Sequence, residues 1–121
     1  MSSIAYVTDR KMIDYHRLCG NTTMNFWRLS AGKEFTDFHR GDLLFFYTRM
    51  SGRTREKGFV GYAHFESAHP LSLRQMWKRY GTLNGYYTQY ELAEAIRRAS
   101  KNDEIPEKMN TLFLKDVVFF N

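Results

Sequence analysis

The stretch GDLLFFYTR, residues 41–49, joins a turn dipeptide to a continuous apolar run. Glycine followed by aspartate favours a turn, and the apolar run has the length of a buried strand. The segment MSGRTREKG, which ends at Gly58, has the polar and basic composition of a loop. A second strand is predicted over Phe59–Ser67, where Gly61 indicates a bulge or a close approach of another backbone. The middle of the chain is therefore expected to be rich in strands.

A strand and a helix are predicted before this block. Residues 4–7 form a short apolar strand, and the Thr-Asp pair at 8–9 has the side chains of a helix N-cap. The helix that follows is expected to stop at Gly20. A polar turn then leads into the segment NFWR, which begins at Asn25.

After the block, His69 and Pro70 are expected to end the second strand. Apolar residues then recur at the spacing of amphipathic helices. The elements expected here are, in chain order, a helix over 71–80 that is ended by Gly81, a turn at Asn84–Gly85, a helix over 89–100, a charged loop over 101–110 and one long or two short strands over 111–120.

The 121 residues suit one domain with one core, so residues 1–121 are predicted to form a single unit. The element order is β-α-β-β-α-α-β, which fits none of the doubly wound arrangements. It indicates an α+β fold whose mixed sheet curls into a small barrel with helices at its ends.

Charge and composition favour an anionic partner. The chain carries 18 Lys and Arg against 13 Asp and Glu, which gives a net charge of +5 and a pI of about 9.4. Aromatic residues make up 17% of the sequence. A basic and aromatic composition is typical of surfaces that bind phosphates and stack bases, although the same aromatics would also fill the core of a small barrel. No membrane span or signal peptide is recognisable, so a cytoplasmic location is expected.

Several classes of chemistry find no support in the sequence. The single cysteine, Cys19, provides neither a disulfide nor a cysteine-based zinc site. The four histidines have no metal-ligand spacing, and no phosphate-binding glycine loop or nucleophile elbow is present. No cofactor, metal site or catalytic residue is predicted, and the chain does not have the features of an enzyme.

The sequence resembles the EVE-type domain of the PUA-like superfamily, and within it the N-terminal module of prokaryotic EVE–HNH restriction endonucleases. The resemblance covers nearly the whole chain and is most specific in the elements VTD, NFWR and WKRYGTLNG. The matching segments, in the order of the family, are AYVTDRKMIDY (5–15), MNFWRLS (24–30), GDLLFFYTR (41–49), GFVGYAHFE (58–66), MWKRYGTLNGYYTQYELAEAI (76–96) and TLFLKDVVFF (111–120).

The resemblance implies a reader of modified bases that acts in modification-dependent restriction. Its expected target is DNA with a C5-modified cytosine, such as 5-methyl- or 5-hydroxymethylcytosine, flipped into an aromatic pocket. Trp27 would be a wall of that pocket and Asn25 and Ser30 its polar contacts, with Tyr47 and Trp77 as further candidates. The residues expected to face phosphates are Arg28, Arg49, Arg53, Arg55 and Lys57. The family also implies a nuclease domain or subunit as a partner.

Other interpretations of the same residues remain open. Trp27 would also serve as core filling, and Trp77 lies on a helix where packing is the ordinary role. The chain is also consistent with an RNA-binding PUA-like module that recognises a modified base, with a protein-interaction domain that has no nucleic-acid role, and with a binder of small nucleosides. Competition between DNA and RNA, and the salt dependence of binding, distinguish these classes.

Overall fold

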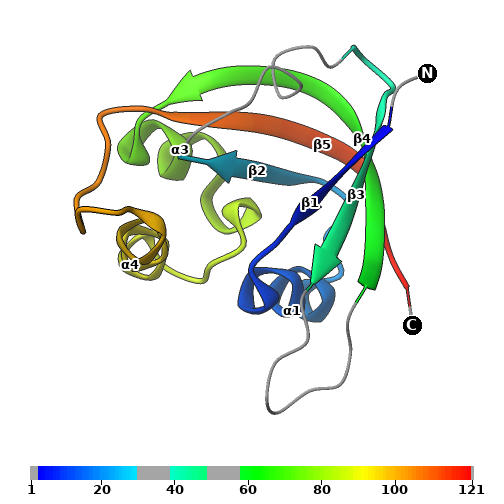
Figure 1. The fold of residues 1–121 in the computed structure, drawn as a ribbon, viewed down its shortest axis with the longest axis horizontal. Helices are drawn as coiled ribbons and strands as arrows, with labels where there is room; N and C mark the ends of the chain where they lie inside the picture. The colour runs from blue at the N-terminus through cyan, green and yellow to red at the C-terminus, as the bar shows by residue number, and fades with distance from the viewer. Residues whose placement is uncertain (1–2, 30–38, 49–57, 121) are drawn as a thin grey trace.

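A computed structural model of the chain describes residues 3–29, 39–48 and 58–120 (Figure 1). The strands are β1 (Ser3–Val7), β2 (Met24–Arg28), β3 (Leu43–Thr48), β4 (Gly58–Leu71) and β5 (Met109–Phe119). The helices are α1 (Arg10–Cys19), α3 (Leu73–Tyr80), the 3₁₀ helix η1 (Gly81–Asn84) and α4 (Gln89–Ala99). The predicted α+β fold, a curled mixed sheet flanked by helices, is confirmed. No helix within these described ranges has the length and apolar character needed to cross a membrane.

One five-stranded sheet, in the order β1-β3-β4-β5-β2, organises the molecule. Among the described strands, β1 and β3 pair in parallel and the other neighbours are antiparallel. Figure 1 shows β4 and β5 as the long, curved strands of the sheet. The helices α3 and α4 lie together on one side, and α1 lies near the ends of β1 and β3. The strands β1 and β2 are the two edges of this curled sheet, and the cavity described below is lined by Thr8 and Asp9, which follow β1, and by residues of β2.

One strand was not predicted, and one strand boundary differs from the prediction. The segment NFWR belongs to β2, which pairs with β5 and places Trp27 opposite Thr111. The polar Asn25 interrupts the apolar pattern of this five-residue strand, so its pairing was not visible in the local sequence. β4 does not end at His69 but continues through Pro70 to Leu71. Beyond the region that pairs with β3, β4 has only β5 beside it among the described strands, and an edge strand tolerates the missing N–H of proline.

Gly61 lies both at a β-bulge and at a close approach of another backbone, the two alternatives that the sequence indicated. The register between β3 and β4 shifts after Phe46 pairs with Gly61, which leaves Val60 as an extra residue in β4. A Cβ atom at Gly61 would lie 2.4 Å from the carbonyl oxygen of Val118 in β5. The bulge and the close approach of β5 therefore coincide at this glycine.

The buried core lies on the inner face of the sheet, where apolar side chains from the strands meet those of α1, α3 and α4. Its members include Ile13, Phe46, Met76, Leu92 and Leu114. In β3 the buried residues alternate with partly exposed ones, so successive side chains point to opposite faces.

The outer face of β3, β4 and β5 carries a chain of aromatic contacts, which we call the outer aromatic row. Its residues are Tyr47, Phe59, Phe45, Tyr62 and Phe120, and neighbouring ring centroids lie 5.6, 5.7, 6.1 and 5.9 Å apart in that order. A substantial part of the aromatic content is therefore in the sheet surface and not in a pocket.

Candidate functional site

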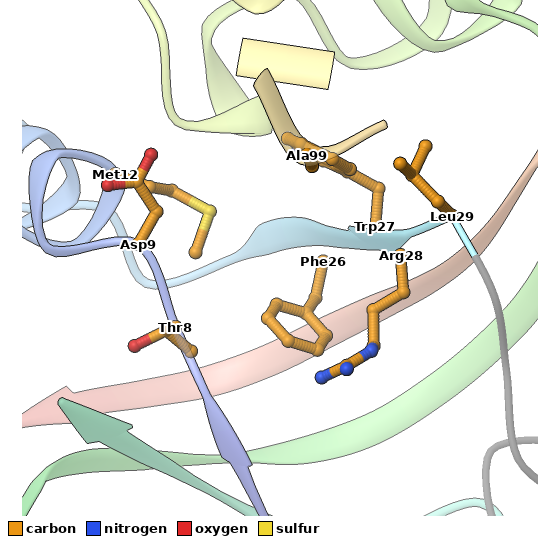
Figure 2. Close-up of a pocket in the computed structure, with 8 residues that line it drawn as sticks. All are labelled: Thr8, Asp9, Met12, Phe26, Trp27, Arg28, Leu29 and Ala99. Atoms are coloured by element: carbon orange, nitrogen blue, oxygen red, sulfur yellow. The ribbon is translucent and has the colours of Figure 1, made fainter. Parts of the chain in front are cut away.

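A cavity of about 270 Å³ lies where the end of β1 and the start of α1 approach the edge strand β2. In Figure 2, Asp9 and Met12 lie on one side of this cavity, and Phe26, Trp27 and Arg28 lie on the other. The lining residues are Thr8, Asp9, Met12, Phe26, Trp27, Arg28, Leu29 and Ala99. A cavity close to the lower end of the roughly 300–1,000 Å³ range of small-molecule pockets suits a group about as large as a nucleobase.

The alternation of side chains in β2 builds one wall of the cavity. Trp27 extends toward Ala99 at the end of α4, whereas Phe26 and Arg28 lie on the opposite side of the strand (Figure 2). Trp27 is half-buried and packs against the core. Its indole nitrogen is buried without a hydrogen-bond partner among the described residues, so the part of the ring that remains accessible is carbon. Trp27 is thus both a packing residue and an apolar cavity wall.

Asp9 forms the opposite wall and is held from two directions. As the N-cap of α1 it accepts a hydrogen bond from the backbone N–H of Lys11 at 3.0 Å. Its other carboxylate oxygen accepts the hydroxyl proton of Tyr86 at 2.6 Å. Tyr86 is almost completely buried. Burial raises the pKa of its phenol strongly, and the hydrogen bond to Asp9 raises it further, so Tyr86 remains a proton donor.

The cavity combines two opposite charges with an otherwise apolar lining. Asp9 and Arg28 are the charged residues among the described residues that line it, and Thr8 adds a hydroxyl that donates to the backbone oxygen of Tyr47 at 3.3 Å. A carboxylate in the wall repels a phosphate by like charge. The arrangement therefore suits a neutral planar group that has hydrogen-bonding edges.

The structure brings Trp27 and Arg28 together at this cavity but places the other described candidates elsewhere. Asn25 is fully buried, and its side-chain amide donates to Asn84 at 2.8 Å. Tyr47 belongs to the outer aromatic row and contributes only its backbone oxygen near the cavity, to Thr8. Trp77 is half-buried on α3 and packs against the core. None of these three lines the cavity.

The remaining candidates lie outside the described residues. They are the polar pocket candidate Ser30 and the phosphate candidates Arg49, Arg53, Arg55 and Lys57. Their assignment stays a prediction from the family resemblance.

Sequence reasoning missed part of the cavity lining. Phe26, Met12 and Ala99 come from three separate elements, and nothing local in the sequence joins them. The sequence identifies Asp9 as a helix-capping residue. Its position in the cavity wall depends on the approach of β2, which the local sequence does not reveal. The recognition of NFWR as a strand would have placed Phe26 and Arg28 on one face by the period of two.

Comparison with solved structures places this architecture among known folds. The ASCH protein from Zymomonas mobilis superposes with a TM-score of 0.60 at 13% identity, over 95% of this chain and 68% of that chain. The hypothetical protein PH0355 superposes with a TM-score of 0.60 at 14% identity, over 95% of this chain and 98% of that chain. No protein-family model and no curated protein sequence matches the chain. At these identities the likeness shows the fold, which is the PUA-like α+β fold of ASCH domains.

Proposed function

We propose that this chain is a nucleic-acid-binding module that receives one unpaired base in the cavity between β1 and β2. The observation that carries the proposal is the cavity itself, which is lined both by the aromatic side chain of Trp27 and by Asp9, whose carboxylate is held by two hydrogen bonds. Its size and its balanced charge suit a neutral base, and the net charge of +5 suits a polyanionic backbone. The PUA-like fold of the neighbours is consistent with this role.

The target that we propose is DNA with a C5-modified cytosine, as the resemblance to EVE–HNH reader modules implies. Flipping a base costs a few kcal/mol, and stacking on an aromatic side chain returns about 1–3 kcal/mol. Contacts to phosphates from Arg49, Arg53, Arg55 and Lys57 would supply non-specific affinity. One buried methyl group adds about 0.8 kcal/mol, so a marked preference for 5-methylcytosine requires close packing of that methyl group against the cavity wall.

A second candidate function uses the same cavity. A base in single-stranded RNA needs no flipping out of a duplex. It would therefore enter the same cavity at a lower free-energy cost than a base in double-stranded DNA. A nuclease domain or subunit belongs to the DNA proposal alone, because restriction requires cleavage of the marked DNA. A protein-interaction role would leave the cavity unused.

Binding titrations with duplexes of one sequence test the proposal. The duplexes carry cytosine, 5-methylcytosine or 5-hydroxymethylcytosine at one central position, and a matched single-stranded RNA serves as competitor. A preference of about tenfold or more for a modified duplex is expected, on top of a salt-dependent basal affinity. Stronger competition by RNA would favour the second candidate. The absence of binding to every probe would leave the protein-interaction role.

Trp27→Ala is the decisive variant, and Trp77→Ala is its matched control. Both tryptophans are half-buried and pack against the core, but only Trp27 lines the cavity. Both substitutions are expected to lower the free energy of unfolding by about 1–3 kcal/mol, below the cost of a fully buried tryptophan. Only Trp27→Ala is expected to abolish the preference for the modified base. If both variants lose the preference for the modified base equally, the loss is due to impaired folding and not to the cavity.

A further inference from the structure

The carboxylate of Asp9 offers hydrogen-bond acceptors to the cavity. An ionised carboxylate has about four lone-pair sites. Two hydrogen bonds use one site on each oxygen, namely those from the Lys11 N–H and the Tyr86 hydroxyl. Asp9 is exposed and belongs to the cavity lining, so a ligand in the cavity lies next to this residue.

We infer that Asp9 is a specificity-determining residue that selects bases with an exocyclic amino group and rejects their keto counterparts. The inference rests on the proposed function and deepens it. Cytosine and adenine present an amino donor, and aspartate is a known acceptor for the cytosine amino group. The keto oxygen of thymine or uracil would instead face the carboxylate with acceptor against acceptor, which leaves both groups unpaired.

The selection depends on a fixed orientation of the carboxylate, and Tyr86 supplies it. A terminal carboxylate torsion is broad when it is free. Here the N-cap bond comes from the helix that Asp9 begins, and the Tyr86 bond comes from the segment between η1 and α4. Because Tyr86 is held in the core, the plane of the carboxylate is set by two groups that do not touch the ligand. Tyr86 is therefore a positioning residue.

The test compares two nucleotides that differ at this group alone. A short duplex carries 5-methylcytosine or thymine opposite an abasic site, so that both share the C5 methyl group and neither has a pairing partner to lose. The wild-type protein is expected to bind the 5-methylcytosine duplex about tenfold or more tightly. Asp9→Asn presents an amide that donates as well as accepts, and is expected to abolish or invert this ratio while asparagine retains the N-cap.

Two further variants make the result specific. Asp14→Asn removes the same charge from an exposed position of α1 and is expected to leave the ratio unchanged. Tyr86→Phe keeps the carboxylate but removes its orienting donor, and is expected to lower the ratio without reaching that of Asp9→Asn. Thermal unfolding of each variant confirms that it is folded.

The outcomes separate the inference from the proposed function. If the wild type prefers 5-methylcytosine and Asp9→Asn keeps that preference, Asp9 is not the selecting group. If the wild type binds both duplexes equally and Trp27→Ala weakens both, the base pocket stands and the inference fails. If neither duplex binds above an abasic duplex without a test base, both fail together.

Discussion

The hydroxyl of Tyr86 donates to the carboxylate of Asp9 at 2.6 Å, although the two residues are 77 positions apart in the chain. The bond joins the first turn of α1 to the segment between η1 and α4. It thereby ties the start of α1, which lines the candidate cavity, to a segment outside the cavity lining. The wall formed by Asp9 is accordingly a product of the tertiary fold and not of the helix cap alone.

Tyr86→Phe is expected to lower the free energy of unfolding by about 1.5–3 kcal/mol, the range for a hydrogen bond to a charged group. The phenyl ring of the variant still fills the core, so the loss of stability measures the contribution of the Tyr86 hydroxyl group. Tyr87→Phe is the matched control, because Tyr87 is the next residue and its side chain is 69% exposed. Denaturant unfolding at neutral pH measures both changes. A loss within 0.5 kcal/mol of that control, as is usual for surface substitutions, would show that the bond contributes no stability.

Local structure was well predicted wherever a single residue determines the local conformation. Asp9 caps α1 through the backbone of Lys11, and Gly20 ends that helix in the left-handed conformation. Asn84 and Gly85 form the expected turn. In each case the chemistry acts over a few positions, so neighbouring residues contain all the necessary information.

The site was harder to predict because its parts depend on pairing between distant segments. Asn25 looked like a polar contact for a ligand, but it is buried against Asn84, which itself donates to the backbone oxygens of Met76 and Gly81. The aromatic content suggested a base pocket, yet Tyr47 belongs to the outer aromatic row. Composition counts aromatic residues without telling which face of a sheet they occupy.

Gly61→Ala is expected to destabilise the sheet severely, by about 2 kcal/mol or more. The added Cβ would meet the carbonyl oxygen of Val118 at 2.4 Å and the backbone of Phe119 at 3.1 Å, so strands β4 and β5 would have to separate locally. Ser67→Ala, in the same strand, is a control without that clash. Thermal or denaturant unfolding gives the comparison. Equal stability of the two variants would mean that β4 and β5 adjust at no measurable cost.

His16 is expected to make the protein less stable in mild acid. The ring is fully buried, and its Nδ1 accepts a hydrogen bond from the side-chain amide of Asn21 at 3.0 Å, which requires that this nitrogen carry no proton. Burial lowers the pKa of His16 from 6.5 to about 4. Between these two values the unfolded chain binds more protons than the folded protein, so stability rises with pH across this window.

The contribution of His16 is therefore complete above pH 6.5, falls as the pH decreases toward 4 and is lost below it. A shift of this size corresponds to about 3 kcal/mol between neutral pH and the acid limit. Denaturant unfolding at a series of pH values from 7 to 4 measures the slope in wild type and in His16→Gln, which cannot titrate. The variant is expected to have the shallower slope, whereas His69→Gln, at an exposed position of β4, should follow the wild type. Parallel slopes in wild type and His16→Gln would show that the buried imidazole does not control acid stability.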